Sequence, residues 1–131
     1  MRLDIGCGKN KKDGFVGLDF VDYGQEYIHD ITKPFLFGDK TIEEIYCSHT
    51  LEHIDDIKIV IEEFKRLTNK ITIIVPHRCH TWANCVGHIR LFDEEYFSKY
   101  FPDFKVKTEA YQCSDFGWGL QIEAIWQEEG R

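Results

Sequence analysis

The amino-acid sequence predicts an α/β fold, a three-layer domain built on a mostly parallel β-sheet. Segments with the pattern of strands alternate with segments with the pattern of helices along the 131 residues. Residues 71–75 form a continuous β-branched run, as a strand buried on both faces requires. Near the N-terminus a glycine turn follows a short apolar strand directly, which is typical of ligand-binding turns in such sheets.

The first two strands and their connection carry the main functional signal. Residues 3–5 are expected to form a strand, after which Gly6 and Gly8 allow a sharp turn beside a bound ligand. The second strand, residues 15–19, ends at Asp19, whose carboxylate can accept both hydroxyls of a ribose. The connection is shorter than the ~10–12 residues of a helical crossover, so the usual first helix is shortened or missing.

The remaining elements follow from local pattern and turn signals. We expect an edge strand over 27–29, a strand over 43–47, a helix begun by Asp55 or Asp56 and stopped near Asn69, a strand over 71–75, a helix over 93–100 capped by Asp93, and strands over 104–109 and 120–127. The last two strands resemble a hairpin, so one edge strand is expected to run antiparallel.

Composition limits the class of protein. A chain of 131 residues has room for one domain, and its net charge of −7 argues against general nucleic-acid binding. No apolar run approaches the roughly 20 residues that span a bilayer, and no leader is evident. Five cysteines without a pattern do not suggest disulfides, so we expect a cytoplasmic protein without membrane attachment.

Four segments together resemble the class I S-adenosylmethionine-dependent methyltransferases, in their compact small-molecule-type branch. They are Leu3-Asp4-Ile5-Gly6-Cys7-Gly8, Val16-Gly17-Leu18-Asp19, residues 45–54, and Val75-Pro76-His77 with residues 88–92. The resemblance implies a Rossmann-like seven-stranded sheet of order 3-2-1-4-5-7-6 with an antiparallel seventh strand. The chain shows no helical pattern before the first strand, so we expect a version of this fold that is truncated at its N-terminus, with few helices on one sheet face. An uncovered apolar face favours a homo-oligomer or a partner chain that covers it.

The resemblance also implies a cofactor, S-adenosyl-L-methionine, and a set of binding residues. Gly6, Cys7 and Gly8 would contact the methionine moiety, and Ser48 would converge on them. Asp4 would support the loop, although it can equally be a strand-end carboxylate that caps nearby amides. Asp19 would bind the ribose, and Asp30-Ile31 would lie beside the adenine.

Two histidines are candidates for a catalytic base that removes a proton from the methyl acceptor. His49 follows the fourth strand, where the transferred methyl group should point, and His77 follows the fifth. Either can instead be a structural histidine bonded to backbone. Arg90 can pair with an acidic substrate or with Asp93, and we favour Asp93.

A polar loop, 77–88, contains four potential metal ligands. They are Cys79, His80, Cys85 and His88. Their spacing lacks the tight pair of a structural zinc site, so we expect no metal and a loop that covers the substrate. Cys7 and Cys47 are expected to be buried small apolar residues.

These observations favour a methyltransferase that acts on a small-molecule or otherwise unidentified acceptor. One alternative keeps the cofactor and loses the reaction, which gives a binding or regulatory module. A second alternative is a nicotinamide-dependent oxidoreductase, but Lys11 stands where the third glycine of its Gly-x-Gly-x-x-Gly loop should be.

Overall fold

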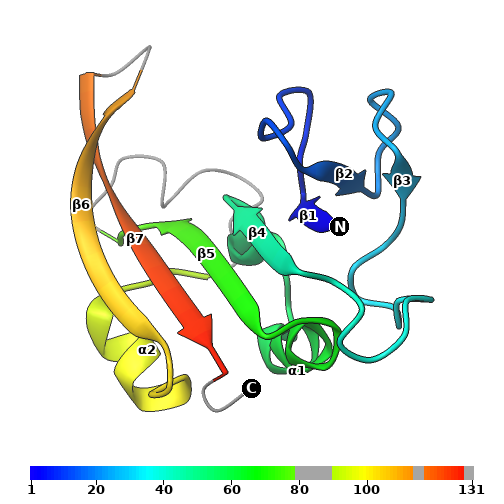
Figure 1. Ribbon diagram of the computed structural model, residues 1–131. Helices are drawn as coiled ribbons and strands as arrows, with labels where there is room; N and C mark the ends of the chain where they lie inside the picture. The colour runs from blue at the N-terminus through cyan, green and yellow to red at the C-terminus, as the bar shows by residue number, and fades with distance from the viewer. Residues whose placement is uncertain (79–89, 114–116, 129–131) are drawn as a thin grey trace.

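The computed structural model describes residues 1–78, 90–113 and 117–128, and within them a seven-stranded sheet of order β3-β2-β1-β4-β5-β7-β6 forms the framework (Figure 1). The strands are β1 Arg2–Ile5, β2 Val16–Asp19, β3 Tyr27–Ile28, β4 Glu44–Ser48, β5 Lys70–Pro76, β6 Lys105–Cys113 and β7 Gly117–Gln127. The strand order implied by the resemblance is therefore confirmed.

Only β7 runs against the strands on either side of it in the described sheet. It pairs antiparallel with both β5 and β6, while the pairs among β1 to β5 are parallel. The expected antiparallel edge strand is thus wrong in position, because β7 lies inside the sheet and β6 forms the edge. Both strands are also longer than predicted, since their pairing continues from Lys105↔Ile125 to Cys113↔Gly117.

Two α-helices and one short 3₁₀ helix are described. Helix α1 spans Ile57–Leu67, α2 spans Glu94–Tyr100, and the 3₁₀ helix η1 spans Leu51–His53. The predicted caps are confirmed, since the Asp56 carboxylate accepts from Ile59 N and that of Asp93 from Tyr96 N. Helix α1 ends at Leu67, two residues before the predicted stop. Among the described helices, none has the length and apolar character that a membrane span needs.

Both described α-helices pack on the same side of the sheet, so the described residues form two layers rather than the expected three, with one apolar core between helices and sheet (Figure 1). The apolar stripe of α1 meets alternate residues of the central strands. Its members are Ile57, Val60, Ile61, Phe64 and Leu67 from α1, with Leu3, Ile5, Ile45, Ile71 and Ile73 from the strands. Phe92 and, from α2, Phe97, whose ring centres lie 5.7 Å apart, extend the same cluster to the second helix.

The opposite face of the sheet is polar rather than apolar. Glu44 of β4 lies between Arg2 and Lys70 of the adjacent strands, with nitrogen–oxygen distances of 3.6 Å to both. Farther along, Lys107 of β6 lies 3.4 Å from Glu123 of β7. The expectation of an uncovered apolar face is therefore wrong, because alternate positions of these strands carry charged side chains that water can solvate. Association with a second copy or a partner chain stays a prediction, but burial of an apolar sheet face is no longer a reason for it.

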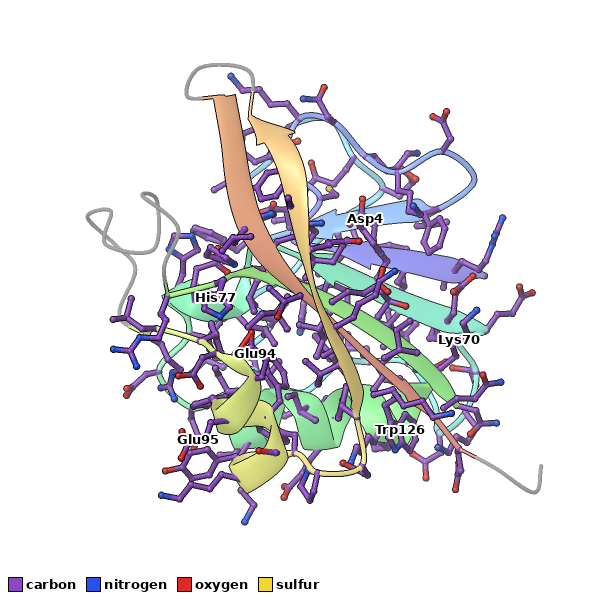
Figure 2. All side chains as sticks on the ribbon, turned by 90° about the vertical axis from the view of Figure 1, so that its left-hand side faces the viewer. Asp4, Lys70, His77, Glu94, Glu95 and Trp126 are labelled. Carbon is purple, nitrogen blue, oxygen red and sulfur yellow. The ribbon has the colours of Figure 1, made fainter. Side chains whose placement is uncertain are left out.

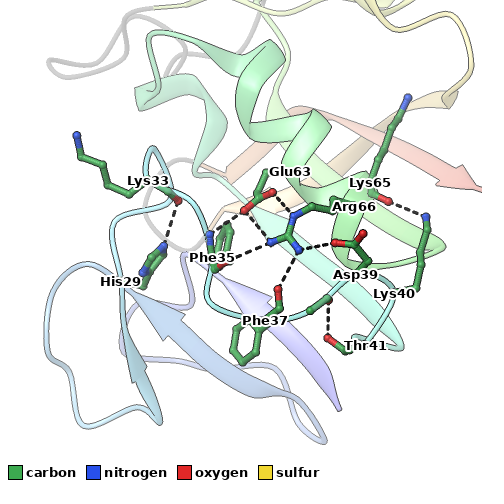
Figure 3. A network of polar contacts seen from close by, with 11 residues as sticks. His29, Lys33, Phe35, Phe37, Asp39, Lys40, Thr41, Glu63, Lys65 and Arg66 are labelled. Atoms are coloured by element: carbon green, nitrogen blue, oxygen red, sulfur yellow. Dashed lines mark hydrogen bonds and ion pairs between the residues drawn. The ribbon is translucent and has the colours of Figure 1, made fainter.

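Arg66 of α1 fastens the long connection from β3 to β4 onto the helix (Figure 3). Its guanidinium donates to the carbonyls of Phe35 and Phe37 at 3.2 and 2.9 Å and to the Asp39 carboxylate at 2.8 Å. Glu63, one turn earlier, pairs with Arg66 and accepts from Phe35 N at 2.7 Å. A connection with no described helix of its own is thus held by charged hydrogen bonds.

We expect the carboxylate of Glu63 to make stability depend on pH. Its bond to Arg66 is the largest cause that holds the pKa of Glu63 below its ordinary value. A pKa lowered by folding stabilises the native state above the unfolded pKa, and that stability is lost as pH falls through the folded pKa. In urea unfolding at pH 7, Glu63→Gln should lower the free energy of unfolding by about 1 kcal/mol. The difference in this free energy between the variant and wild type should become smaller towards pH 3.

The matched control for this prediction is Glu62→Gln, on the same helix. The side chain of Glu62 is exposed, so its removal should change stability little at either pH. If the difference in unfolding free energy between Glu63→Gln and wild type stays constant down to pH 3, the role given to the Glu63–Arg66 pair is contradicted.

Candidate functional site

The carboxyl ends of β1, β2 and β4 meet at one edge of the sheet, and Gly6 lies where they converge. Its φ of +73° is in the left-handed region, and its N–H donates to Leu18 O of β2 at 2.7 Å. A Cβ at this position would overlap the side chain of Thr50, which follows β4. Gly6 is therefore required both for the turn and for the close approach of two strand ends.

Asp19 links the second strand to the glycine turn. Its carboxylate is largely buried and accepts from Gly8 N at 3.0 Å and from Val21 N at 3.2 Å. Each oxygen thus receives one amide, and an ionised carboxylate can accept about four hydrogen bonds. Asp19 therefore fixes the turn while retaining acceptor capacity towards the adjoining cavity.

That cavity has a volume of about 590 Å³, which is within the range of small-molecule sites. Five predicted residues line it: Gly6, Asp19, Asp30, Ile31 and His49. The lining also contains residues that sequence analysis missed: Phe20, Tyr23, His29, Thr32, Thr50, His53 and Ile54. Phe20 stands out among them, because its ring is 73% exposed directly after Asp19. Its position after the acidic strand end was the signal that could have identified it.

A smaller hollow of about 340 Å³ lies on the other side of Gly6. Three further members of the predicted set line it, namely Asp4, Cys7 and Ser48. The rest of its lining is Gly6, Asn10, Lys12 and Tyr46. Gly8 lines neither space and acts through its N–H on Asp19. The predicted cofactor residues therefore group around Gly6, in two adjoining spaces.

Asp4 supports the loop as predicted, and it does so by capping an amide. Its Oδ2 accepts from Lys12 N at 2.8 Å, and the Lys12 ammonium lies 4.5 Å from the centre of the Tyr46 ring. Burial raises the pKa of Asp4, and the Lys12 N–H opposes this shift. Its two proposed roles, loop support and amide cap, thus coincide.

The structure separates the two candidate bases. His49 has a left-handed backbone, with φ of +53°, and lines the larger cavity. The imidazole of His77 is buried, and its Nε2 lies 2.9 Å from Glu94 Oε1 at the start of α2 (Figure 2). His77 lines neither space, because the chain after β5 runs beside Phe92, where Arg78 N donates to Phe92 O.

Glu94 is shared between two partners. It accepts from the Thr108 hydroxyl of β6 as well as contacting His77. Its pKa is lowered, chiefly by the Thr108 hydrogen bond and also by His77. Glu94 therefore connects His77, at the end of β5, with α2 and β6.

Cys7 and Cys47 are buried free thiols, as expected. Burial, and next the nearby Glu52 carboxylate, raise the pKa of Cys47, so its reactive thiolate is suppressed. The four possible metal ligands, Cys79, His80, Cys85 and His88, lie outside the described residues. Within the described ranges, no group of three or more ligating side chains could hold a metal.

A groove of about 640 Å³ between α1 and α2 contains Arg90 but none of the predicted cofactor or catalytic residues. The predicted pairing of Arg90 with Asp93 is wrong, because Arg78 lies 3.4 Å from the Asp93 carboxylate. Arg90 instead donates to the Tyr96 hydroxyl at 3.2 Å and to Asp55 O. Its guanidinium therefore joins the chain before α1 to α2.

Comparison with known proteins bears on the fold. No family model and no curated protein matches the chain. Among solved structures, a S-adenosylmethionine-dependent methyltransferase from Methanosarcina mazei is 14% identical, with a TM-score of 0.70 over 97% of this chain and 91% of that one. A Thermotoga maritima methyltransferase, described as a possible histamine N-methyltransferase, is 11% identical, with a TM-score of 0.74 over 98% and 81%.

The chain has the class I methyltransferase fold. A Mesorhizobium loti S-adenosylmethionine-dependent methyltransferase agrees as well, at 14% identity and a TM-score of 0.64 over 97% of this chain and 90% of that one. Within the methyltransferase fold, the cavity beside Gly6 and Asp19 lies beyond the carboxyl ends of β1 and β4, where the strand order reverses. Open α/β sheets bind their ligands at such a switch point.

Proposed function

We propose that this protein is a S-adenosylmethionine-dependent methyltransferase that acts on a small-molecule acceptor in the cytoplasm. One observation carries the proposal: Gly6 and Asp19 line the same 590 Å³ cavity at the switch point of a methyltransferase fold. A turn that exposes backbone and a carboxylate with spare acceptor capacity are the groups that hold a nucleoside.

The residues present fit this cofactor. Asp19 would accept the ribose hydroxyls, and Asp30 and Ile31 would lie beside the adenine. The hollow lined by Asp4, Cys7 and Ser48 continues from Gly6 and suits the methionine end, with Gly8 holding Asp19 in place. When bound, S-adenosylmethionine supplies an electrophilic methyl group on a sulfonium.

The protein contributes position and a base. Holding acceptor and methyl group in line can contribute up to ~7–11 kcal/mol to catalysis. His49 lines the cavity after β4 and is therefore our catalytic base. His77 is no longer needed in that role, because its imidazole pairs with Glu94 outside the cavity.

Calorimetry separates this proposal from its alternatives. We expect S-adenosylmethionine and S-adenosylhomocysteine to bind and NAD not to bind. Binding of NAD alone would favour the nicotinamide-dependent oxidoreductase. Methyl transfer to a panel of metabolites is then measured for the native protein and for His49→Ala. This comparison separates an enzyme from a binding module without catalysis.

Phe20 offers a test that leaves folding intact. Its exposed ring is available to stack on the adenine, and stacking of a base on an aromatic side chain contributes about 1–3 kcal/mol. Phe20→Ala should weaken S-adenosylhomocysteine roughly tenfold in calorimetry while the melting temperature of the free protein stays unchanged. Leu36→Ala is the control, because Leu36 is 99% exposed and does not line the cavity. Equal affinity in both variants would remove Phe20 from the site.

A further inference from the structure

A carboxylate is buried in the short helix that borders the cavity, and burial of a charge is costly. Glu52 belongs to η1 and is only 1% exposed, while the residues before and after η1, Thr50 and Ile54, line the cavity. A buried carboxyl is expensive to desolvate and is retained where it serves a specific partner.

His49 supplies a neighbour for that carboxylate. The imidazole Nδ1 lies 3.7 Å from Glu52 Oε2, within ion-pair distance but longer than a hydrogen bond. Catalytic hydrogen bonds are often long in structures without substrate and shorten in the reacting complex. The two groups are therefore placed to form a carboxylate–imidazole pair.

The backbone holds His49 in this position. Its left-handed conformation is uncommon for a residue with a side chain, and its N–H donates to Ile74 O of β5 at 2.8 Å. Strained residues of this kind concentrate at active sites, where the surrounding structure maintains them. The hydrogen bond to β5 therefore fixes the backbone of His49, from which the imidazole side chain extends.

Other titratable groups lie on the elements around His49 and contribute to its electrostatic surroundings. They are Cys47 from β4, Asp19, Tyr23, His29 and Asp30 from the cavity wall, His53 from η1, and Tyr111 of β6 at a ring distance of 6.2 Å. Beside them, the Glu52 carboxylate lies within ion-pair distance of the His49 imidazole.

We propose that Glu52 is a positioning residue that keeps the proton of neutral His49 on Nδ1, so that Nε2 is free to take a proton from an acceptor hydroxyl. This inference rests on the proposed function and narrows the acceptor to a hydroxyl compound. In the reaction, the acceptor oxygen forms a bond to the methyl carbon as the carbon–sulfur bond breaks, its electron pair remaining on sulfur. The hydroxyl proton passes to Nε2 of His49 and later to water.

The proton's location can be measured on the full chain by nitrogen-15 NMR of the histidine rings, with His49→Asn to assign the signal. At a pH where His49 is neutral, the native protein should show the Nδ1–H form. Glu52→Gln keeps the shape and removes the charge, so the ratio of the two tautomers should move about tenfold towards Nε2–H. Glu94→Gln is the matched control, since it alters the partner of His77 and should leave His49 unchanged.

The outcomes are distinct. A native protein with His49 already in the Nε2–H form overturns the proposal, even where Glu52→Gln fails to fold. A tautomer ratio unchanged by Glu52→Gln in a folded protein also overturns it. If S-adenosylhomocysteine does not bind the native protein, the proposed function is rejected. The NMR result still shows whether Glu52 holds the proton of His49 on Nδ1.

The acceptor class is tested with labelled S-adenosylmethionine and a panel of phenols beside the corresponding anilines. A base adds roughly 10²–10⁴ to the rate when it removes the acceptor proton, so phenols should be methylated and His49→Asn should abolish most of that rate. Transfer confined to the anilines would overturn the assignment of a hydroxyl acceptor.

Discussion

Replacing Gly6 by alanine is expected to destabilise the fold more than the same change at Gly8 or Gly17. The left-handed φ of +73° disfavours alanine, and the new Cβ would overlap the Thr50 side chain. Conformational strain and overpacking together should lower the free energy of unfolding by about 3 kcal/mol and the melting temperature by roughly 10 °C. Thermal unfolding followed by circular dichroism measures this effect.

Gly8→Ala separates the two causes. Gly8 also has a positive φ, of +57°, but a Cβ there would meet nothing within 4 Å. Gly8→Ala should therefore lower the free energy of unfolding by about 1–2 kcal/mol, from backbone conformation alone. Adding Thr50→Ala to Gly6→Ala should recover part of the loss, because the overlapping hydroxyl is removed. Equal effects of the two glycine substitutions would show that contact with Thr50 does not matter.

Local patterns in the sequence were sufficient for most of the framework. The β-branched run at 71–75 identified a central strand, and Asp56 and Asp93 identified both helix starts. These features depend on nearby residues, so a single sequence reveals them. The strand order came from the resemblance, since local pattern does not determine which strands are neighbours.

Features that depend on distant contacts were missed or misplaced. Nothing near Glu52 in the sequence predicts that its carboxylate is buried beside His49, because burial depends on how η1 packs against the rest of the fold. The contact of His77 with Glu94 likewise joins residues seventeen positions apart. The polar sheet face was overlooked because its charges become neighbours only when β4 pairs with β1 and β5.

The site remains ordered although the described helices cover only one face of the sheet. Helices α1 and α2 cover one face, and the other carries charge pairs that need no helix to bury them. The loop that replaces the first crossover is held at both ends, by Asp4 on Lys12 N and by Asp19 on Gly8 N. Two carboxylates thus stabilise the glycine turn that a helix would otherwise follow.

Asp19→Ala is expected to cause the largest loss of cofactor affinity. Two ribose hydroxyls would each lose a charged acceptor, and at about 1.4 kcal/mol for each bond the affinity for S-adenosylhomocysteine should fall roughly 100-fold. Isothermal titration calorimetry measures the change. Asp19→Asn retains one acceptor oxygen and should lie between alanine and wild type.

The loss could arise instead through the turn, because Asp19 also holds Gly8 N and Val21 N. A ligand without ribose hydroxyls distinguishes the two causes. If Asp19 binds the hydroxyls, the 2′,3′-dideoxy analogue of S-adenosylhomocysteine should bind the native protein and Asp19→Ala with nearly equal, weak affinity. If Asp19 acts only on the turn, both ligands should lose affinity by the same factor, and the ribose contact would be rejected while the fold stands.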